Sequence, residues 1–368
     1  MVVTIVVLLI LAGISLNLVL RQNGIISRAQ DARNQTVEGQ VNTEKAINAL
    51  TDEMEDLISE NENSGNGGNS EGGNSGGSGS TVDGVPIPAG FVYVGGTKAS
   101  GLVISDASAD KEKYKGQTTV GTDLEGNQFV WVPVDNIADY KRIWYTGYGN
   151  FESFSEILPE DEKTSVETNK GYYIGRYEAG DQESTNAHAL RISSSSTSNK
   201  ITVKAGQAPY NYVTRDEAKS LAEGFKTQQN YSSSVTTKLV SSYAWDTAIA
   251  FIQKTNSDYG RSSEEGNYND SPTFTYTGIA DTEKNKRTKA NGTRILIPTG
   301  QTTAVNNIYD MGGNVFEWTT ESCSGTGNPY TYRGGFCLGD FTESPAGYRV
   351  GSSDSASAYR GFRCTLFL

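Results

Sequence analysis

The segment from residue 308 to residue 321, IYDMGGNVFEWTTE, combines a glycine turn with large apolar side chains. Gly312 and Gly313 allow the backbone to turn sharply. Phe316 and Trp318 follow at once, and side chains of this size can anchor the core of a loop-rich domain. The segment therefore predicts a tight turn that leads into a short buried run.

The same turn holds three oxygen donors close together in the sequence. They are the side chains of Asn314 and Glu317 and the main-chain carbonyl of Val315. Hard oxygen ligands of this kind suit calcium, whereas polar turn residues commonly form hydrogen bonds within their own loop. We carry both interpretations forward, a calcium site and a hydrogen-bonded turn.

Around this turn, residues 82–368 alternate short strand-like runs with loops. Runs rich in β-branched and aromatic residues predict strands, and two runs with an apolar stripe predict helices. Thr214 and Glu217 form a capping box at the start of the first helix. We predict an α+β domain dominated by loops, with strands within residues 90–96, 126–134, 170–179 and 293–299 and helices within residues 214–225 and 241–255.

A set of motifs follows in order along this domain, and it includes IPAGFVYV, YYIGRYEAG, GNVFEW, YRGG and GFRC. The ordered set resembles the formylglycine-generating enzyme family, also called sulfatase-modifying factors, over nearly all of residues 82–368. The resemblance implies a loop-rich variant of the C-type lectin fold, and it implies calcium near Asn314. From the GFRC motif itself we predict that Arg363 has a structural role and pairs with a carboxylate.

Enzymes of that family oxidise a substrate cysteine with two cysteines that hold copper shortly after the RGG motif. Soft Cu(I) favours two thiolates, yet Cys337 is followed by no second cysteine before Cys364. Related iron enzymes on this scaffold use three histidines, and His188 is the single histidine of the chain. We therefore expect no copper, no iron and no catalytic residues. The alternative is a copper-dependent formylglycine-generating oxidase or a related metal enzyme of the same fold.

A second branch of the same fold, the variable proteins diversified by retroelements, contacts its ligands between the RGG and GFR motifs. Mutating adenines in codons that end in a pyrimidine excludes Glu, Lys, Gln, Met and Trp, and residues 336–360 depart from the permitted set only at Glu343. The resemblance implies that ligand contacts lie in this segment. Aromatic residues contribute a large area at low entropic cost and would be the anchors. The predicted contact residues are Phe336, Cys337, Leu338, Asp340, Phe341, Glu343, Tyr348, Ser352, Ser353, Asp354 and Tyr359. The other interpretation assigns the aromatics to the core, and we expect at least Tyr348 to be partly buried.

The N-terminal part of the chain differs from the rest. Residues 1–20 are apolar and match the hydrocarbon thickness of a bilayer, residues 21–59 have a helical period, and residues 60–81 are a flexible tether of Gly, Ser and Asn. This order resembles the N-terminal helix of type IV pilins and pseudopilins followed by a linker. A plain membrane anchor is the alternative.

The net charge of -12 argues against nucleic acid as a partner, because phosphate contacts need clustered Lys and Arg. The resemblance implies a disulfide partner for Cys364, but the usual mate is missing from the helix within residues 214–225. Cys323 can substitute only if the two Cα atoms come within roughly 4.4–6.8 Å.

Together these features predict a non-catalytic, adhesin-like ligand-binding protein of the cell surface, with its C-terminal domain extracellular. Its ligand would be an extracellular protein or glycan, and residues 1–20 would join it to the membrane or to other pilin subunits. A minor pilin whose domain binds only its neighbours is a third hypothesis.

Overall fold

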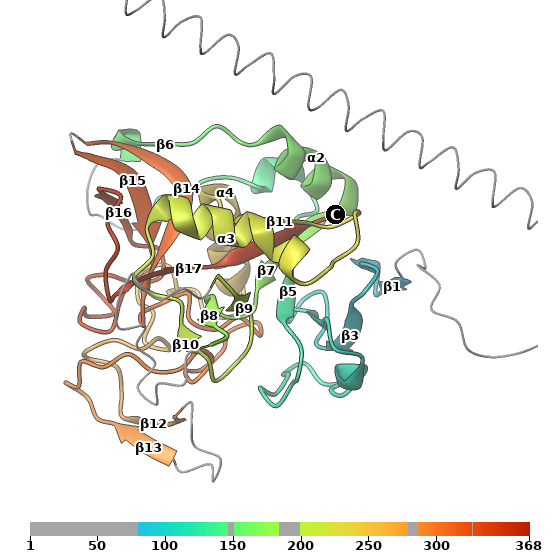
Figure 1. Cartoon of the computed structure of the whole chain (residues 1–368), viewed down its shortest axis with the longest axis horizontal. Helices are drawn as coiled ribbons and strands as arrows, with labels where there is room; N and C mark the ends of the chain where they lie inside the picture. The colour runs from blue at the N-terminus through green and yellow to red at the C-terminus, as the bar shows by residue number, and fades with distance from the viewer. Residues whose placement is uncertain (1–79, 146–150, 184–198, 279–285, 326) are drawn as a thin grey trace, which may run out of the picture. The chain divides into compact units, whose positions relative to one another are not determined.

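The computed structural model describes residues 80–145, 151–183, 199–278, 286–325 and 327–368 (Figure 1). The predicted apolar helix 1–20, the stalk 21–59, residues 60–79 of the tether and His188 lie outside the described residues. None of the helices in the described part is both long and apolar enough to cross a bilayer. Ser80 and Thr81, which we predicted as tether, already belong to the first strand.

The centre of the domain is a six-stranded antiparallel sheet with the order β11-β18-β7-β5-β4-β3. The β-branched and aromatic runs predicted as strands within residues 90–96, 126–134 and 170–179 supply β3, β5 and β7, as expected. The strand nearest the C-terminus, β18, lies between β11 and β7. The strands are β3 (Val92–Gly95), β4 (Val103–Ser105), β5 (Gln128–Pro133), β7 (Gly171–Gly175), β11 (Thr236–Leu239) and β18 (Cys364–Phe367).

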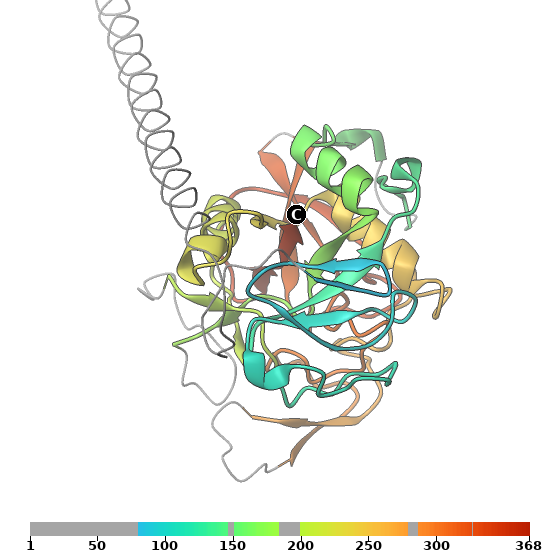
Figure 2. The ribbon, with the colours of Figure 1, turned by 90° about the vertical axis from the view of Figure 1, so that its right-hand side faces the viewer.

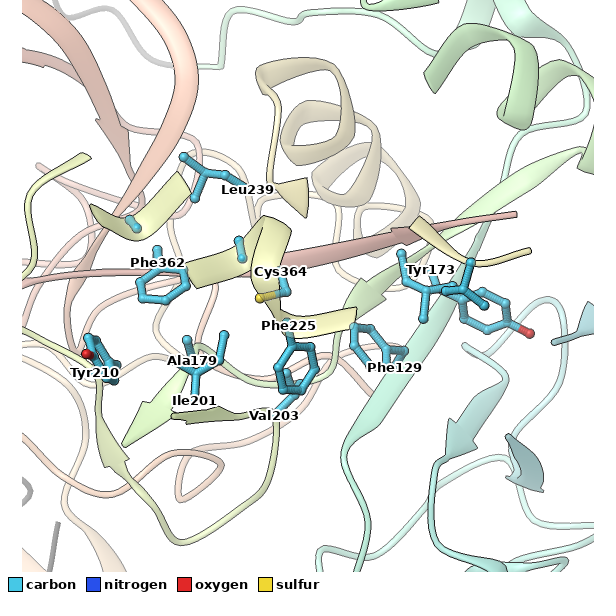
Figure 3. Close-up of a cluster of buried hydrophobic side chains, with 14 of the residues drawn as sticks. Phe129, Tyr173, Ala179, Ile201, Val203, Tyr210, Phe225, Leu239, Phe362 and Cys364 are labelled. Atoms are coloured by element: carbon cyan, nitrogen blue, oxygen red, sulfur yellow. The ribbon is translucent and has the colours of Figure 1, made fainter. Parts of the chain in front are cut away.

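Alternation along these strands builds one apolar cluster on each face of the sheet, because successive side chains in a strand point to opposite faces. In β5, Phe129 and Trp131 belong to one cluster, whereas Val130 and Val132 belong to the other. Figure 3 shows the first cluster, in which Phe129, Phe225 and Cys364 come from three different elements.

Three α-helices occur in the described part of the chain: α2 (Glu160–Asn169), α3 (Arg215–Gln228) and α4 (Ser242–Ile252). Helix α3 adds Ala218, Ala222 and Phe225 to the first cluster, and α4 adds its apolar stripe to the second. The two helices therefore cover opposite faces of the sheet (Figure 2). The predicted capping box is confirmed, with Thr214 and Glu217 bonded reciprocally.

Helix α2 was not predicted, because Val166 is its one large apolar residue and no helical stripe exists. The feature of the sequence that favours this helix is its charge pattern. Glu160, Asp161 and Glu162 occupy the first turn, where carboxylates interact favourably with the positive end of the helix dipole.

A second sheet carries the C-terminal third of the domain in the order β16-β15-β14-β17, and β6 pairs with β14 as well. All of its pairs are antiparallel except β14 with β17. Its strands are β6 (Phe154–Ser155), β14 (Phe316–Gly325), β15 (Asn328–Arg333), β16 (Arg349–Ser352) and β17 (Arg360–Phe362).

Short elements complete the described part. They are the pair β1 (Ser80–Val82) and β2 (Val85–Ile87), the sheet β10-β8-β9 of β8 (Gly180–Asp181), β9 (Ile201–Thr202) and β10 (Ala208–Pro209), the hairpin β12 (Phe274–Thr277) and β13 (Lys286–Lys289), and the 3₁₀ turns η1 (Ser108–Asp110), η2 (Ile137–Asp139) and η3 (Phe151–Ser153). The domain is thus mostly sheet and loop with few helices, which agrees with the predicted loop-rich α+β class.

The strand predicted within residues 293–299 is wrong, and the side chain of Asn314 explains why. Its Oδ1 accepts from the Ile297 main-chain N at 3.1 Å, and its Nδ2 donates to the Ile297 carbonyl at 3.1 Å. One side-chain amide thus satisfies the main chain of Ile297 in place of a neighbouring strand.

Candidate functional site

Residues 336–360, the predicted contact segment, leave the end of β15 and return to the same sheet as β16 and β17. The RGG motif makes the exit from β15. Gly334 has a φ of +77°, and a Cβ on Gly335 would lie 2.1 Å from the carbonyl oxygen of Ser344. Glycine is required at both positions, because a side chain would strain the backbone at the first and clash at the second.

The two arginines that bracket residues 334–348 are held by one buried carboxylate. Asp246 of α4 accepts from Arg333 and, at 2.7 Å, from Arg349. Arg349 also pairs with the buried Glu321 at 2.7 Å, and Glu321 in turn pairs with Arg142. This alternating chain of charges fixes both ends of the loop to the second sheet and to α4.

Aromatic side chains from the contact segment stack on the second sheet. The ring of Phe336 stacks on Phe316 with centroids 4.4 Å apart, and Tyr348 lies parallel to the same ring at 6.4 Å. Tyr359 meets Phe336 edge-on at 5.8 Å. We call Phe336, Tyr348 and Tyr359, the half-buried members of this stack, the aromatic platform; their buried support is Phe316 and Tyr332.

The structure sorts the predicted contact residues into three groups. Glu343, Ser353 and Asp354 are exposed, and Cys337 and Ser352 are buried. The remaining six are half-buried: Phe336, Leu338, Asp340, Phe341, Tyr348 and Tyr359. The expectation that Tyr348 is partly buried is confirmed. Cys337 is fully buried and Ser352 is 5% exposed, so these two are the least accessible of the predicted contact residues.

Several of these side chains also bond within the domain. The Asp354 carboxylate accepts from the main-chain N of Arg215 at 2.6 Å, in the first turn of α3. Asp340 accepts from Asn269 at 3.2 Å, and the main-chain N of Phe341 donates to Asp270 at 3.0 Å. The contact segment 336–360 is thus bonded to α3 through Asp354 and to residues 269–270 through Asp340 and Phe341.

Cys337 packs in a small apolar cluster with Leu296 and Val315 rather than at the surface. Burial raises the pKa of its thiol to about 12, and burial in the main core does the same for Cys364. Both therefore stay protonated, whereas a copper ligand must be a thiolate. Cys323, Cys337 and Cys364 are all free thiols, so the Cys323–Cys364 bridge is not formed. These donors do not fit a two-thiolate copper site.

Asn314 and Glu317, two of the predicted calcium ligands, have protein partners for their side-chain oxygens. Glu317 forms a two-pronged pair with Arg363, at 3.0 and 2.7 Å, and Asn314 Oδ1 accepts from Asn267 and Ile297. The predicted pairing of Arg363 with a carboxylate is confirmed. These are the bonds of the hydrogen-bonded-turn interpretation, and calcium near Asn314, Val315 and Glu317 stays a prediction.

Two buried oxygens beside Asn314 lack a hydrogen-bond partner in the described part of the chain: Glu178 Oε2 and Asn267 Oδ1. Among the residues that the structure describes, these two oxygens form no hydrogen bond that a calcium ion would have to displace. Over the described residues, no group of three or more His, Cys, Asp and Glu side chains is arranged to hold a metal ion.

The pH dependence of stability offers a test of this interior. Burial, together with the nearby carboxylates of Asp310 and Glu317, raises the pKa of Glu178 well above its ordinary value of 4.5. Between the pKa of the unfolded chain and the higher pKa of the folded state, the folded state keeps a proton that the unfolded chain has released. Stability therefore falls as pH rises through that interval, by about 1.4 kcal/mol per pH unit.

Glu178→Gln removes this titration. Its unfolding free energy relative to wild type should thus be higher at pH 8 than at pH 5, as measured by urea unfolding. The exposed Glu343→Gln is the control, and equal differences at the two pH values would contradict the prediction.

Arg360 belongs to the site but was not predicted. Its guanidinium lies over the rings of Trp318 and Tyr332, at 5.4 and 5.0 Å from their centroids. The available signal was its place directly before the GFRC motif, which puts it at the first position of β17. The platform thus borders on a cation held by aromatic faces.

Comparison with known proteins adds little to this description. No family model matches the chain, and no curated protein matches it. One similar solved structure is CarF, with a TM-score of 0.35 and 14% identity, and the match covers 54% of this chain and 87% of that chain. Another is PvdO from Pseudomonas aeruginosa, with a TM-score of 0.30 and 16% identity, and the match covers 54% of this chain and 82% of that chain. Treponema denticola variable protein 1 has a TM-score of 0.39 and 13% identity, and the match covers 68% of this chain and 98% of that chain. At these low values the similarities carry no argument about function.

Proposed function

We propose that residues 82–368 form a non-catalytic ligand-binding domain with a C-type-lectin-like fold, and that the aromatic platform contacts the ligand. The observation that carries the proposal is the packing of Phe336, Tyr348 and Tyr359 on the buried rings of Phe316 and Tyr332. Half-buried rings of this kind are already ordered, so they contribute contact area at little further entropic cost.

The surroundings of the platform suit a binding surface. Arg360 supplies a cation beside the rings, and the exposed Glu343, Ser353 and Asp354 supply polar groups in the same segment. An apolar centre with polar groups around it is the usual arrangement of a protein interface. We propose an extracellular protein or a glycan as the ligand, and diversification of this segment by a retroelement as the source of its residue set.

The rest of the proposal concerns display. Residues 1–20 would anchor the chain in the membrane or in a pilin filament, and the tether would hold the domain free at the cell surface. Calcium near Asn314 would be its single cofactor. Binding that survives deletion of residues 1–60 supports a free binding domain, whereas binding lost together with assembly supports a minor pilin.

The test of the platform begins with a screen on printed glycans and on a panel of extracellular proteins, followed by titration of the strongest binder. Phe336→Ala and Tyr359→Ala should each weaken that binding at least tenfold, which is about 1.4 kcal/mol. Tyr359 contributes its main-chain carbonyl to the pairing with Phe316, so its side chain can be removed without breaking the ladder.

The control is Ile157→Ala, since Ile157 is 92% exposed and lies outside the platform. Binding that Ile157→Ala weakens and that Tyr359→Ala leaves unchanged would move the site away from the platform. Conversion of a cysteine peptide to its aldehyde in the presence of copper would replace the proposal by the oxidase alternative.

A further inference from the structure

A cleft separate from the platform lies between the two sheets, with a volume of about 580 Å³. Helix α3 lines the cleft through one face, and the rest of the lining comes from β11, β14, the segment from the end of β6 into the first turn of α2, and Arg142; the helices and strands are labelled in Figure 1. This volume is in the range of small-molecule binding sites, roughly 300–1,000 Å³.

The lining of the cleft is rich in cations on a chain whose net charge is -12. Its ionisable residues are four cations and three carboxylates, namely Arg142, Arg215, Lys219, Lys238, Glu156, Glu162 and Glu223. The lining is therefore more positive than the chain as a whole.

The carboxylates in the floor of the cleft are satisfied by the protein. Glu156 accepts from the main-chain N of Ser242 at 2.8 Å and from the hydroxyls of Ser242 and Thr320. Glu162 accepts from Tyr140 at 2.8 Å and Ser241 at 2.7 Å. Burial raises the pKa of both carboxyls, to about 7 for Glu156. The oxygens of Glu156 are thus taken up by uncharged donors, whereas Glu162 also lies 3.7 Å from Lys238.

Each cation at the mouth has an acid at the rim as a partner. Lys219 faces Glu223 at 3.8 Å, Arg215 pairs with Asp216 at 3.1 Å, and Lys238 pairs with Asp161 at 2.6 Å. Lys238 also lies 3.7 Å from the buried Glu162, and Arg215 also donates to the carbonyls of Thr319 and Thr320. The three rim acids are 50–64% exposed, and an ion pair with a solvent-exposed partner contributes little stability. An incoming anion can replace these three rim acids at small cost.

The remaining lining favours an organic ligand over a bare inorganic ion. Ile157, Pro159 and Leu239 present apolar surface, and Ser155 and Ser322 present hydroxyls. A planar guanidinium such as that of Arg215 binds carboxylates through paired hydrogen bonds. We propose that this cleft binds a small organic carboxylate, held by Arg215, Lys219 and Lys238 with its body against the apolar wall.

The test is calorimetric titration of the full chain at low salt with glucuronate, butyrate and inorganic phosphate. We expect saturable one-site binding of at least one of the two carboxylates. Tighter binding of glucuronate would indicate that the cleft prefers a carboxylate with a hydroxylated carbon skeleton. Tighter binding of butyrate would indicate a preference for an apolar skeleton. Lys219→Glu should weaken the binding at least tenfold, and Lys226→Glu, on the same helix but outside the lining, should leave it unchanged.

Both lysines are at the surface, so neither variant should disturb folding, and circular dichroism checks this. Added salt should weaken binding, since the ligand and the cations that hold it attract each other by charge. The proposal is overturned if neither carboxylate saturates the wild type, if phosphate binds as tightly as both, or if Lys219→Glu binds like Lys226→Glu.

Discussion

Asp246→Ala is expected to destabilise the domain by about 3–5 kcal/mol, a large share of the stability of a typical domain. Asp246 is fully buried, and its carboxylate joins Arg333 and Arg349, which are also buried. Without it, the three arginines of the charge chain face Glu321 alone. Uncompensated buried charge is among the most costly defects that a substitution can create.

Urea unfolding of the wild type and the variant measures this loss. Asp216→Ala is the matched control, because Asp216 is also a helical aspartate paired with an arginine but is 64% exposed; it should cost less than about 1 kcal/mol. Since Arg333 and Arg349 fix both ends of the loop 334–348, Asp246→Ala should also weaken binding at the platform. Unfolding curves that coincide for Asp246→Ala and Asp216→Ala would show that the charge chain does not stabilise the fold.

Arg363→Met is expected to have an effect of similar size, at least about 3 kcal/mol. Arg363 bonds both oxygens of Glu317 and also donates to the carbonyls of Gly175 at 2.8 Å and Tyr309 at 2.9 Å. It therefore joins β14, β7 and the turn before β14. Removing it leaves a buried carboxylate and two carbonyls without donors.

The pH dependence separates this mechanism from a simple packing defect. Burial raises the pKa of Glu317 to about 7, although Arg363 favours the ionised form. Loss of Arg363 raises that pKa further, so the variant should lose more stability at pH 8 than at pH 5. The double variant Glu317→Gln/Arg363→Met should recover part of the loss at pH 8, because the carboxylate that lost its partner is then gone as well. A loss that is the same at both pH values and in the double variant would contradict the prediction.

The parts of the fold that sequence reasoning predicted well are those with a local signal. The capping box of Thr214 and Glu217 marks the start of α3, and the stripe Ala244, Trp245, Ala248, Ile249 and Ile252 marks the buried face of α4. Asp246 lies within that same helix, yet nothing local shows that it is buried. Its partners are 87 and 103 residues away in the chain, and only the fold brings them together.

The candidate site was predictable in outline for the same reason. The RGG and GFRC motifs bracket the segment, and its aromatic residues pack in the platform or, like Phe341, against Tyr268, while their role as ligand anchors stays a prediction. The burial of Cys337 was not predicted, because polarity and sequence position do not show whether a small loop residue points to the core or to solvent. The main-chain N of Cys337 donates to the Asn314 carbonyl at 3.0 Å, and this bond holds Cys337 against the interior of the domain.

The position of β18 has a consequence for synthesis of the chain. Strand β7 pairs with β5 on one side, but its other neighbour, β18, lies nearly two hundred residues further along, with Thr365 opposite Ile174. While the ribosome is still translating the intervening segment, β7 and β11 have no strand between them. Contacts between such distant residues form slowly, and an exposed strand edge invites pairing with other chains. The nascent domain is therefore most prone to aggregation just before residues 364–367 emerge.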